Sequence, residues 1–225
     1  MTKRTQDRPP AHPEGPGVGV GDQLRTEALG LGAVVAALEA GAVVAIPTDT
    51  VYGLAVDPTR PGATSALFAL KSRPEELDLP VLVGSIEQAE ALAGPDGFPA
   101  PARRLAHRFW PGPLTIVVPR RRGLDWDLGA HAQTIGLRLP DHAVVRTLCD
   151  EVGALATTSA NLHGEPPCTD ADAVERAFDS RVVVFDGGRC AGAPSTVVSV
   201  LGEDPKCLRE GAVAWADVLA IVGRD

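Results

Sequence analysis

The chain has 225 residues, of which 44% are hydrophobic, so it contains enough apolar material for one substantial core. Its formal net charge of −8 argues against a protein that binds nucleic acid through its overall electrostatic field. No apolar run approaches the roughly 18 residues of a membrane span, and the N-terminus lacks the apolar stretch of a signal peptide. We therefore expect a cytoplasmic protein with no membrane association.

The four cysteines are too far apart in the sequence to form a metal site of the zinc type. They form no CxxC pair, and no histidines cluster around them. We expect reduced, mostly structural thiols and no bound structural metal at Cys149, Cys168, Cys190 and Cys207.

Residues 1–22 are rich in proline, glycine and charge and show no periodicity, so they are predicted to be a disordered tail. Residues 23–225 are predicted to form one domain. The GVGVG string at 17–21 is not interpreted as a nucleotide fingerprint, because no strand precedes it to aim its backbone amides.

Apolar spacing along the domain predicts alternating helices and strands. Strands are expected at 42–46, 79–83, 114–119, 134–139, 154–157, 181–185 and 195–200. Helices are expected at 26–40, 62–71, 86–93, 100–108, 142–151, 170–178 and 214–222. Two strands follow one another without a helix between 114 and 139, so the pattern favours a mixed sheet over a pure doubly wound one.

A dense polar turn follows the first strand, which Pro47 ends. It contains Thr48, Asp49 and Thr50, then Tyr52 and a glycine, before the apolar run resumes. Such hydroxyls and carboxylates commonly cap backbone amides in turns, and they can equally face a ligand at a strand end. This segment alone does not decide between the two interpretations.

Lys71 and Arg73 stand just before the strand at 79–83. A lysine ammonium beside a planar guanidinium suits a polyphosphate, whereas basic residues at the end of a helix also interact favourably with its dipole. In the later strand, the period of two places Thr134, Gly136 and Arg138 on one face. An arginine there can fork onto a carboxylate, or can belong to an exposed sheet face.

Small hydroxyl and amide side chains gather at the ends of the later strands. Thr157, Ser159 and Asn161 follow one strand, Ser195 begins another, and Arg209 lies further on. Neutral donors of this kind bind phosphates or amino acids, and they also form ordinary turns.

The conjunction of these segments is more specific than any one of them. Seven strings occur in order over residues 26–215: IPTDTVYGLAVD, KSRP, FWPGPLTIVVP, TIGLRLP, TTSANLHGEPP, STVV and LREGAV. In this order and spacing the chain resembles the YrdC-like family, whose members are L-threonylcarbamoyladenylate synthases.

The resemblance implies an α/β fold with a twisted open mixed sheet and helices around a concave, positively lined cavity. It implies a nucleotidyltransferase that condenses L-threonine, bicarbonate and ATP, with Mg²⁺, into threonylcarbamoyl-adenylate and releases pyrophosphate. A downstream tRNA threonylcarbamoyltransferase complex would then modify an adenosine of tRNA.

The resemblance also implies roles for individual residues. Threonine would be held by Thr48, Arg138, Thr157 and Ser195. The nucleotide would be held by Arg73, Thr134, Ser159, Asn161 and Arg209, with Lys71 and Arg73 as the catalytic cations. Gly84 stands where the family commonly has a histidine. Two alternatives stay open: a paralogue that acts on another amine or on a carbamoyl substrate, and a non-catalytic module with weak RNA binding.

Overall fold

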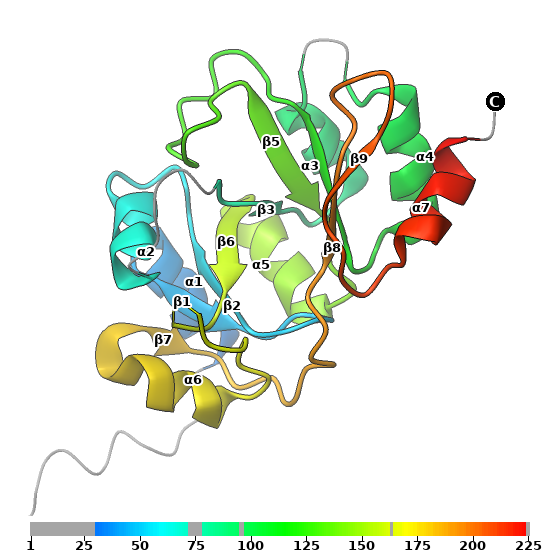
Figure 1. The fold of residues 1–225 in the computed structure, drawn as a ribbon. Helices are drawn as coiled ribbons and strands as arrows, with labels where there is room; N and C mark the ends of the chain where they lie inside the picture. The colour runs from blue at the N-terminus through cyan, green and yellow to red at the C-terminus, as the bar shows by residue number, and fades with distance from the viewer. Residues whose placement is uncertain (1–29, 72–77, 95–96, 163, 224–225) are drawn as a thin grey trace, which may run out of the picture.

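The computed structural model describes residues 30–71, 78–94, 97–162 and 164–223, and within them the chain forms one mixed sheet flanked by helices (Figure 1). Its strands run in the spatial order β7-β1-β2-β6-β3-β5-β4-β8-β9. Their bounds are Val44–Ile46 (β1), Gly53–Val56 (β2), Val81–Leu82 (β3), Leu114–Pro119 (β4), Thr134–Arg138 (β5), Leu155–Ser159 (β6), Val183–Val184 (β7), Thr196–Ser199 (β8) and Lys206–Arg209 (β9).

The sheet combines parallel and antiparallel pairs, as the sequence predicted. β1 and β7, β3 and β5, and β4 and β8 pair in parallel, whereas β4 and β5 pair antiparallel without an intervening helix. The β4/β5 register places Val117 opposite Gly136. Because side chains alternate across a strand, this register sets which residues of both strands face the same side.

Two apolar clusters hold the helices against the sheet. One joins α1 (Leu31–Glu39) and α5 (Ala143–Val152) to buried residues of β1, β2, β3 and β6. The larger one includes residues of α2 (Ala63–Lys71), α3 (Ile86–Leu92), α4 (Ala100–Phe109), α6 (Ala171–Phe178) and α7 (Trp215–Val222). A 3₁₀ turn, Asp179–Arg181, follows α6.

The expected elements are found with small changes of length. β3 and β7 have two residues each, and β6 continues to Ser159, beyond the predicted end at 157. β9 was not predicted, because this edge strand is mostly exposed and shows no apolar alternation. The predicted tail at 1–22 and residues 26–29 of the first helix lie outside the described residues. No helix in the described ranges is long and apolar enough to cross a membrane.

Cys149 illustrates how completely the α1/α5 cluster excludes water. Its side chain is fully buried, and its thiol donates to the Leu82 carbonyl at 3.6 Å. Burial raises the pKa of this thiol to about 12.

We predict that Cys149 resists alkylation in the folded protein, because at about pH 8 only around one thiol in ten thousand would be ionised. Iodoacetamide treatment followed by peptide mass spectrometry should label Cys207, which is partly exposed, before Cys149. Equal labelling of the two cysteines in folded protein would contradict the packing described here.

Candidate functional site

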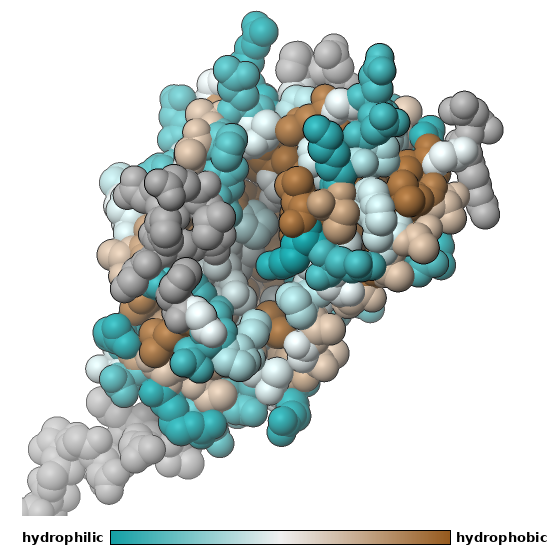
Figure 2. Space-filling model, viewed as in Figure 1, coloured by the Kyte–Doolittle hydropathy of each residue, from teal (hydrophilic) through white to brown (hydrophobic). Residues whose placement is uncertain are grey.

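A cavity of about 580 Å³ opens between the part of the sheet built on β2 and β6 and the part built on β4, β8 and β9. Figure 2 shows this hollow near the centre of the molecule. Seven of the residues nominated from the sequence line it: Thr48, Thr134, Arg138, Thr157, Ser159, Ser195 and Arg209. Strands that are distant in sequence thus place these side chains around one space.

Arg138, at the end of β5, is the buried charge of this cavity, with 6% of its surface exposed. Its Nη2 pairs with the Asp49 carboxylate, its Nη1 donates to the Thr50 hydroxyl at 3.0 Å, and its Nε donates to the Gly112 carbonyl at 3.1 Å. Burial lowers the pKa of Arg138 below its usual value, and the nearby positive Arg209 adds to this effect. The negative Asp49 carboxylate has the opposite effect and raises the pKa of Arg138.

The turn after β1 is tied together by hydroxyl groups. The Thr48 hydroxyl donates to the Val51 carbonyl at 2.7 Å and accepts from the Thr50 and Val51 amides at 3.1 and 3.2 Å. The Thr50 hydroxyl lies 2.8 Å from it. A hydroxyl has one proton to donate, and Thr48 donates its own to Val51, so the Thr50 hydroxyl must donate to Thr48. Thr50 in turn accepts a hydrogen bond from Arg138, so the bonds run from Arg138 through Thr50 to Thr48. The Thr48 hydroxyl therefore organises the turn.

A second polar cluster lies where β4, β8 and β9 meet. The hydroxyls of Ser195 and Thr115 are 3.0 Å apart. Arg209 donates from Nη2 to the Ser195 hydroxyl at 3.0 Å and to the Ser195 carbonyl at 2.8 Å. These bonds hold Arg209 at the cavity wall with its positive charge close to that of Arg138.

Lys71 lies at the end of α2 and contacts the loop after β6. Its ammonium donates to the Ser159 carbonyl at 2.8 Å, and to both the carbonyl and the side-chain oxygen of Asn161 at 2.7 Å. The Ser159 hydroxyl donates to the same Asn161 side-chain oxygen at 2.7 Å. Lys71 and Asn161 thus support Ser159 from behind the cavity wall, and Arg73 lies outside the described residues.

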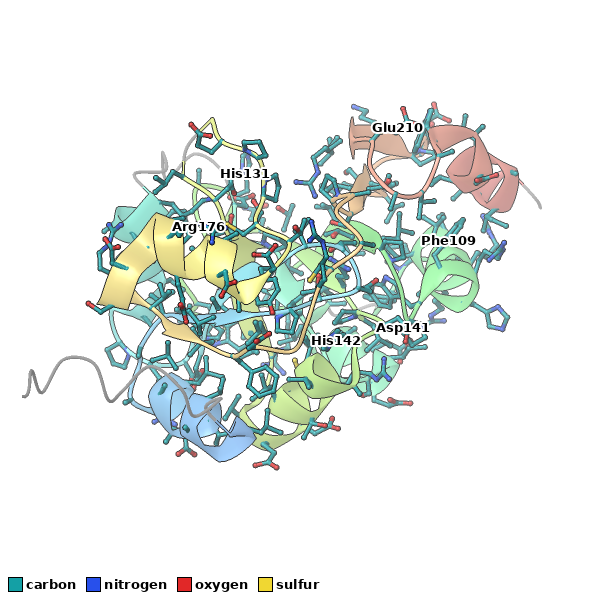
Figure 3. All side chains as sticks on the ribbon, turned by 90° about the horizontal axis from the view of Figure 1, so that it is seen from below. Phe109, His131, Asp141, His142, Arg176 and Glu210 are labelled. Carbon is teal, nitrogen blue, oxygen red and sulfur yellow. The ribbon has the colours of Figure 1, made fainter. Side chains whose placement is uncertain are left out.

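The opposite end of the cavity is more apolar. Val117, Val197, Leu201 and Leu208 line it, and the two leucines are exposed by 48% and 58%. His131, in the loop before β5, pairs there with Asp78 at 3.0 Å (Figure 3). The cavity therefore joins a cationic, hydroxyl-rich end to an end that has more apolar surface together with the His131–Asp78 pair.

No group of three or more histidine, cysteine or acidic residues that could hold a metal ion occurs within the described ranges.

Comparison with known proteins identifies the family. Residues 36–211 match the family model of the Sua5, YciO and YrdC proteins, described as "Telomere recombination". The chain belongs to the Sua5/YciO/YrdC family. This finding confirms the family resemblance that the seven sequence strings indicated.

Two similar bacterial proteins have names that refer to the same activity. The Threonylcarbamoyl-AMP synthase of Bacillus subtilis is 36% identical over 210 residues, which are 92% of this chain and 60% of that protein. A Mycobacterium tuberculosis protein, given the same name provisionally, is 40% identical over 200 residues, 87% of this chain and 90% of that protein.

Solved structures of family members share the fold. Sua5 of P. abyssi complexed with L-threonine superposes with a TM-score of 0.81 at 32% identity, over 88% of this chain and 59% of that one. E. coli YciO superposes with a TM-score of 0.74 at 21% identity, over 82% of this chain and 90% of that one. The mixed α/β sheet expected for the YrdC-like family is thereby confirmed.

Gly84, which stands where the YrdC-like family commonly has a histidine, does not line the cavity. A Cβ added there would come 2.6 Å from the Asp150 carboxylate and 3.2 Å from the Arg146 carbonyl of α5. A side chain at position 84 would thus displace the Asp150 carboxylate and press against α5.

Several site residues were not nominated from the sequence. Asp49, Thr50 and Thr115 contact nominated residues, and His131 and Asp78 line the apolar end. Thr115 had a usable signal, because it is the one hydroxyl in the otherwise apolar strand β4. The pairing of Asp49 with Arg138 had none, since the two are 89 residues apart.

The turn is also fastened to residues 186–192. The buried Tyr52 hydroxyl donates to the Gly188 carbonyl at 2.9 Å, and the Gly192 amide donates to the Thr50 carbonyl at 2.7 Å. Burial, the main cause, raises the pKa of Tyr52 to about 12. The segment 186–192 thus braces the Thr48–Tyr52 turn from outside.

Tyr52 is the only tyrosine of the chain, so its ionisation can be followed directly by phenolate absorbance. We predict a midpoint near 12 in the folded protein, against about 10 in the unfolded chain. Because the folded pKa is raised, the hydroxyl's stabilisation is complete below about pH 10 and is lost as the pH rises toward 12. A midpoint near 10 in protein that is still folded would contradict this burial.

Proposed function

We propose that this chain is a threonylcarbamoyl-AMP synthase, a nucleotidyltransferase that uses L-threonine, bicarbonate and ATP. One observation carries the proposal: a single cavity joins the buried Arg138 and its hydroxyl neighbours to Arg209, Ser159 and an apolar wall. The relatives named threonylcarbamoyl-AMP synthase and the Sua5 structure with L-threonine support the same reaction.

The cationic end suits the carboxylate of an amino acid. A guanidinium has five N–H groups, and the bonds of Arg138 to Asp49, Thr50 and Gly112 use three of them among the described residues. One N–H then remains on each terminal nitrogen, which permits a bidentate contact. We propose that Arg138 binds the threonine carboxylate, with Ser195, Thr157 and Thr48 shaping the space around the rest of the molecule.

The remaining cavity suits a nucleotide. Arg209 provides positive charge, while the Ser159 hydroxyl, whose proton is donated to Asn161, provides a neutral acceptor. Thr134 and the apolar wall lie further along, where a base can be buried. We propose that ATP binds here as its Mg²⁺ complex, with Arg73 joining Arg209 around the phosphates and Lys71 adding its positive charge from behind the cavity wall.

The proposed reaction needs positioning and electrostatics, without a covalent enzyme intermediate. The neutral threonine amine attacks the carbon of carbon dioxide or of bicarbonate and forms an N–C bond. The nitrogen loses one proton, which is released when carbon dioxide reacts and leaves as water with the displaced hydroxide when bicarbonate reacts, and a carbamate remains. A carbamate oxygen then attacks the α-phosphorus of ATP, and the bond to the β-phosphate breaks to release pyrophosphate. Arg209, Lys71, Arg73 and Mg²⁺ would stabilise the charge that develops on this leaving group.

The proposal extends to the cellular context expected from the sequence. Threonylcarbamoyl-adenylate is an activated acyl donor, so we propose that it passes to a tRNA threonylcarbamoyltransferase complex in the cytoplasm. The acidic net charge does not favour a role based on tight RNA binding.

With ATP, Mg²⁺ and bicarbonate, we predict pyrophosphate release that depends on L-threonine. Replacing Arg138 by Ala should lower kcat/KM for threonine by roughly 100-fold, because a charge-assisted carboxylate contact is lost. Arg146→Ala is the matched control, since Arg146 lies on α5 outside the cavity and bonds to the exposed Asp141.

A screen of amino acids and ammonium separates the alternatives. Release that depends on another amine would assign the chain to a paralogue with a different substrate. No amine-dependent release, together with ATP-insensitive RNA binding that weakens steeply with salt, would favour the non-catalytic module.

Gly136 offers an independent test of the cavity. It lies between Thr134 and Arg138 on the lining face of β5, and an added Cβ would meet neighbours at 3.4 Å or more, an ordinary contact. Gly136→Leu should therefore fold but fill the space and weaken ATP binding at least roughly tenfold by steric exclusion. Gly136→Ala is the size control in calorimetric titrations, and wild-type affinity in the leucine variant would refute this location of the nucleotide.

A further inference from the structure

The hydrogen bond to Arg138 explains the position of Asp49 only in part. Its carboxylate pairs with Arg138, and the side chains of this pair are exposed by only 13% and 7%. Its second oxygen, Oδ2, is buried and has no hydrogen-bond partner among the described residues. Asp49 therefore does not cap the turn in which it lies, unlike its neighbour Thr48.

A carboxylate beside a carboxylate-binding arginine weakens the attraction between that arginine and a ligand. The Asp49 carboxylate therefore lowers the affinity for an anionic ligand unless it also has a second, favourable effect on binding. The guanidinium is planar and its N–H donors form a rigid fork. Whether these donors point toward a ligand therefore depends on how the arginine side chain is rotated about its single bonds. An arginine side chain that is free to rotate also loses conformational entropy when it binds.

The contacts of Arg138 fix this rotation from three sides. Asp49 holds Nη2, Thr50 holds Nη1, and the Gly112 carbonyl holds Nε. The first two partners belong to the turn after β1 and the third precedes β4, so they reach the guanidinium from separate segments. Of the three, Asp49 is the charged partner and offers the strongest hydrogen bond.

We propose that Asp49 is a positioning residue, which fixes the plane of the Arg138 guanidinium so that its two remaining N–H groups face the cavity. Asp49 acts through Arg138 and does not line the cavity itself. This inference rests on the proposed function for the identity of the ligand, but the orientation of Arg138 can be measured without any ligand.

Two substitutions separate positioning from charge. Asp49→Asn removes the charge but keeps an oxygen that can accept from Nη2, whereas Asp49→Ala removes both. If positioning dominates, Asp49→Asn should keep the threonine KM within about threefold of wild type, while Asp49→Ala should raise it roughly 30-fold with little change in the KM for ATP. Asp141→Ala, which removes an exposed carboxylate after β5, is the control (Figure 3).

The Arg138→Ala background tests whether Asp49 acts through the arginine. In that background Asp49→Ala should cause no further loss of threonine affinity, because the group that it positions is absent. Equal effects of Asp49→Asn and Asp49→Ala, or additive losses in the double variant, would overturn the proposal.

A ligand-free measurement keeps this result distinct from a failure of the proposed function. In wild-type protein the Arg138 Nε–H should give a slowly exchanging NMR signal, identified by its absence from Arg138→Lys. The signal should persist in Asp49→Asn and broaden or exchange rapidly in Asp49→Ala. Persistence in Asp49→Ala would overturn the positioning role, whatever amine the enzyme uses.

Discussion

The buried guanidinium of Arg138 is the constraint on which the site depends. A charge removed from water is costly unless it is paired and hydrogen-bonded, so the fold must bring acceptors to it. It does so from two separate segments, the turn at Thr48–Tyr52 and the loop around Gly112, and both must be in place before Arg138 is satisfied. The bracing of that turn by residues 186–192 extends the same requirement to a further segment.

Several polar side chains that were expected to contact a ligand also hold the protein together. The Thr48 hydroxyl bonds within its turn, the Thr157 hydroxyl donates to the Leu54 carbonyl at 2.9 Å, and Lys71 supports the loop at Ser159. The structural and functional interpretations of such segments are therefore not exclusive. A site that works by positioning gains from side chains that are already fixed before the ligand arrives.

The cavity has a chemical gradient from cations and hydroxyls at Arg138 and Arg209 to the apolar surface at Leu201 and Leu208. A ligand pair with a carboxylate, phosphates and an aromatic base matches this gradient along its whole length. The same gradient gives little to a polyanion such as RNA, whose affinity would need an extended basic surface that a chain of net charge −8 does not favour.

The sequence by itself determined the alternation of helices and strands, the mixed sheet, the family and seven of the polar residues that line the cavity. These follow from local patterns: apolar periodicity within each element and short polar strings at strand ends. Only the tertiary structure decided that β9 completes the sheet, that Thr115 meets Ser195, and that Asp49 holds Arg138. These depend on strand order and register, which are set by contacts between distant segments, and a shift of one residue would turn each side chain to the other face.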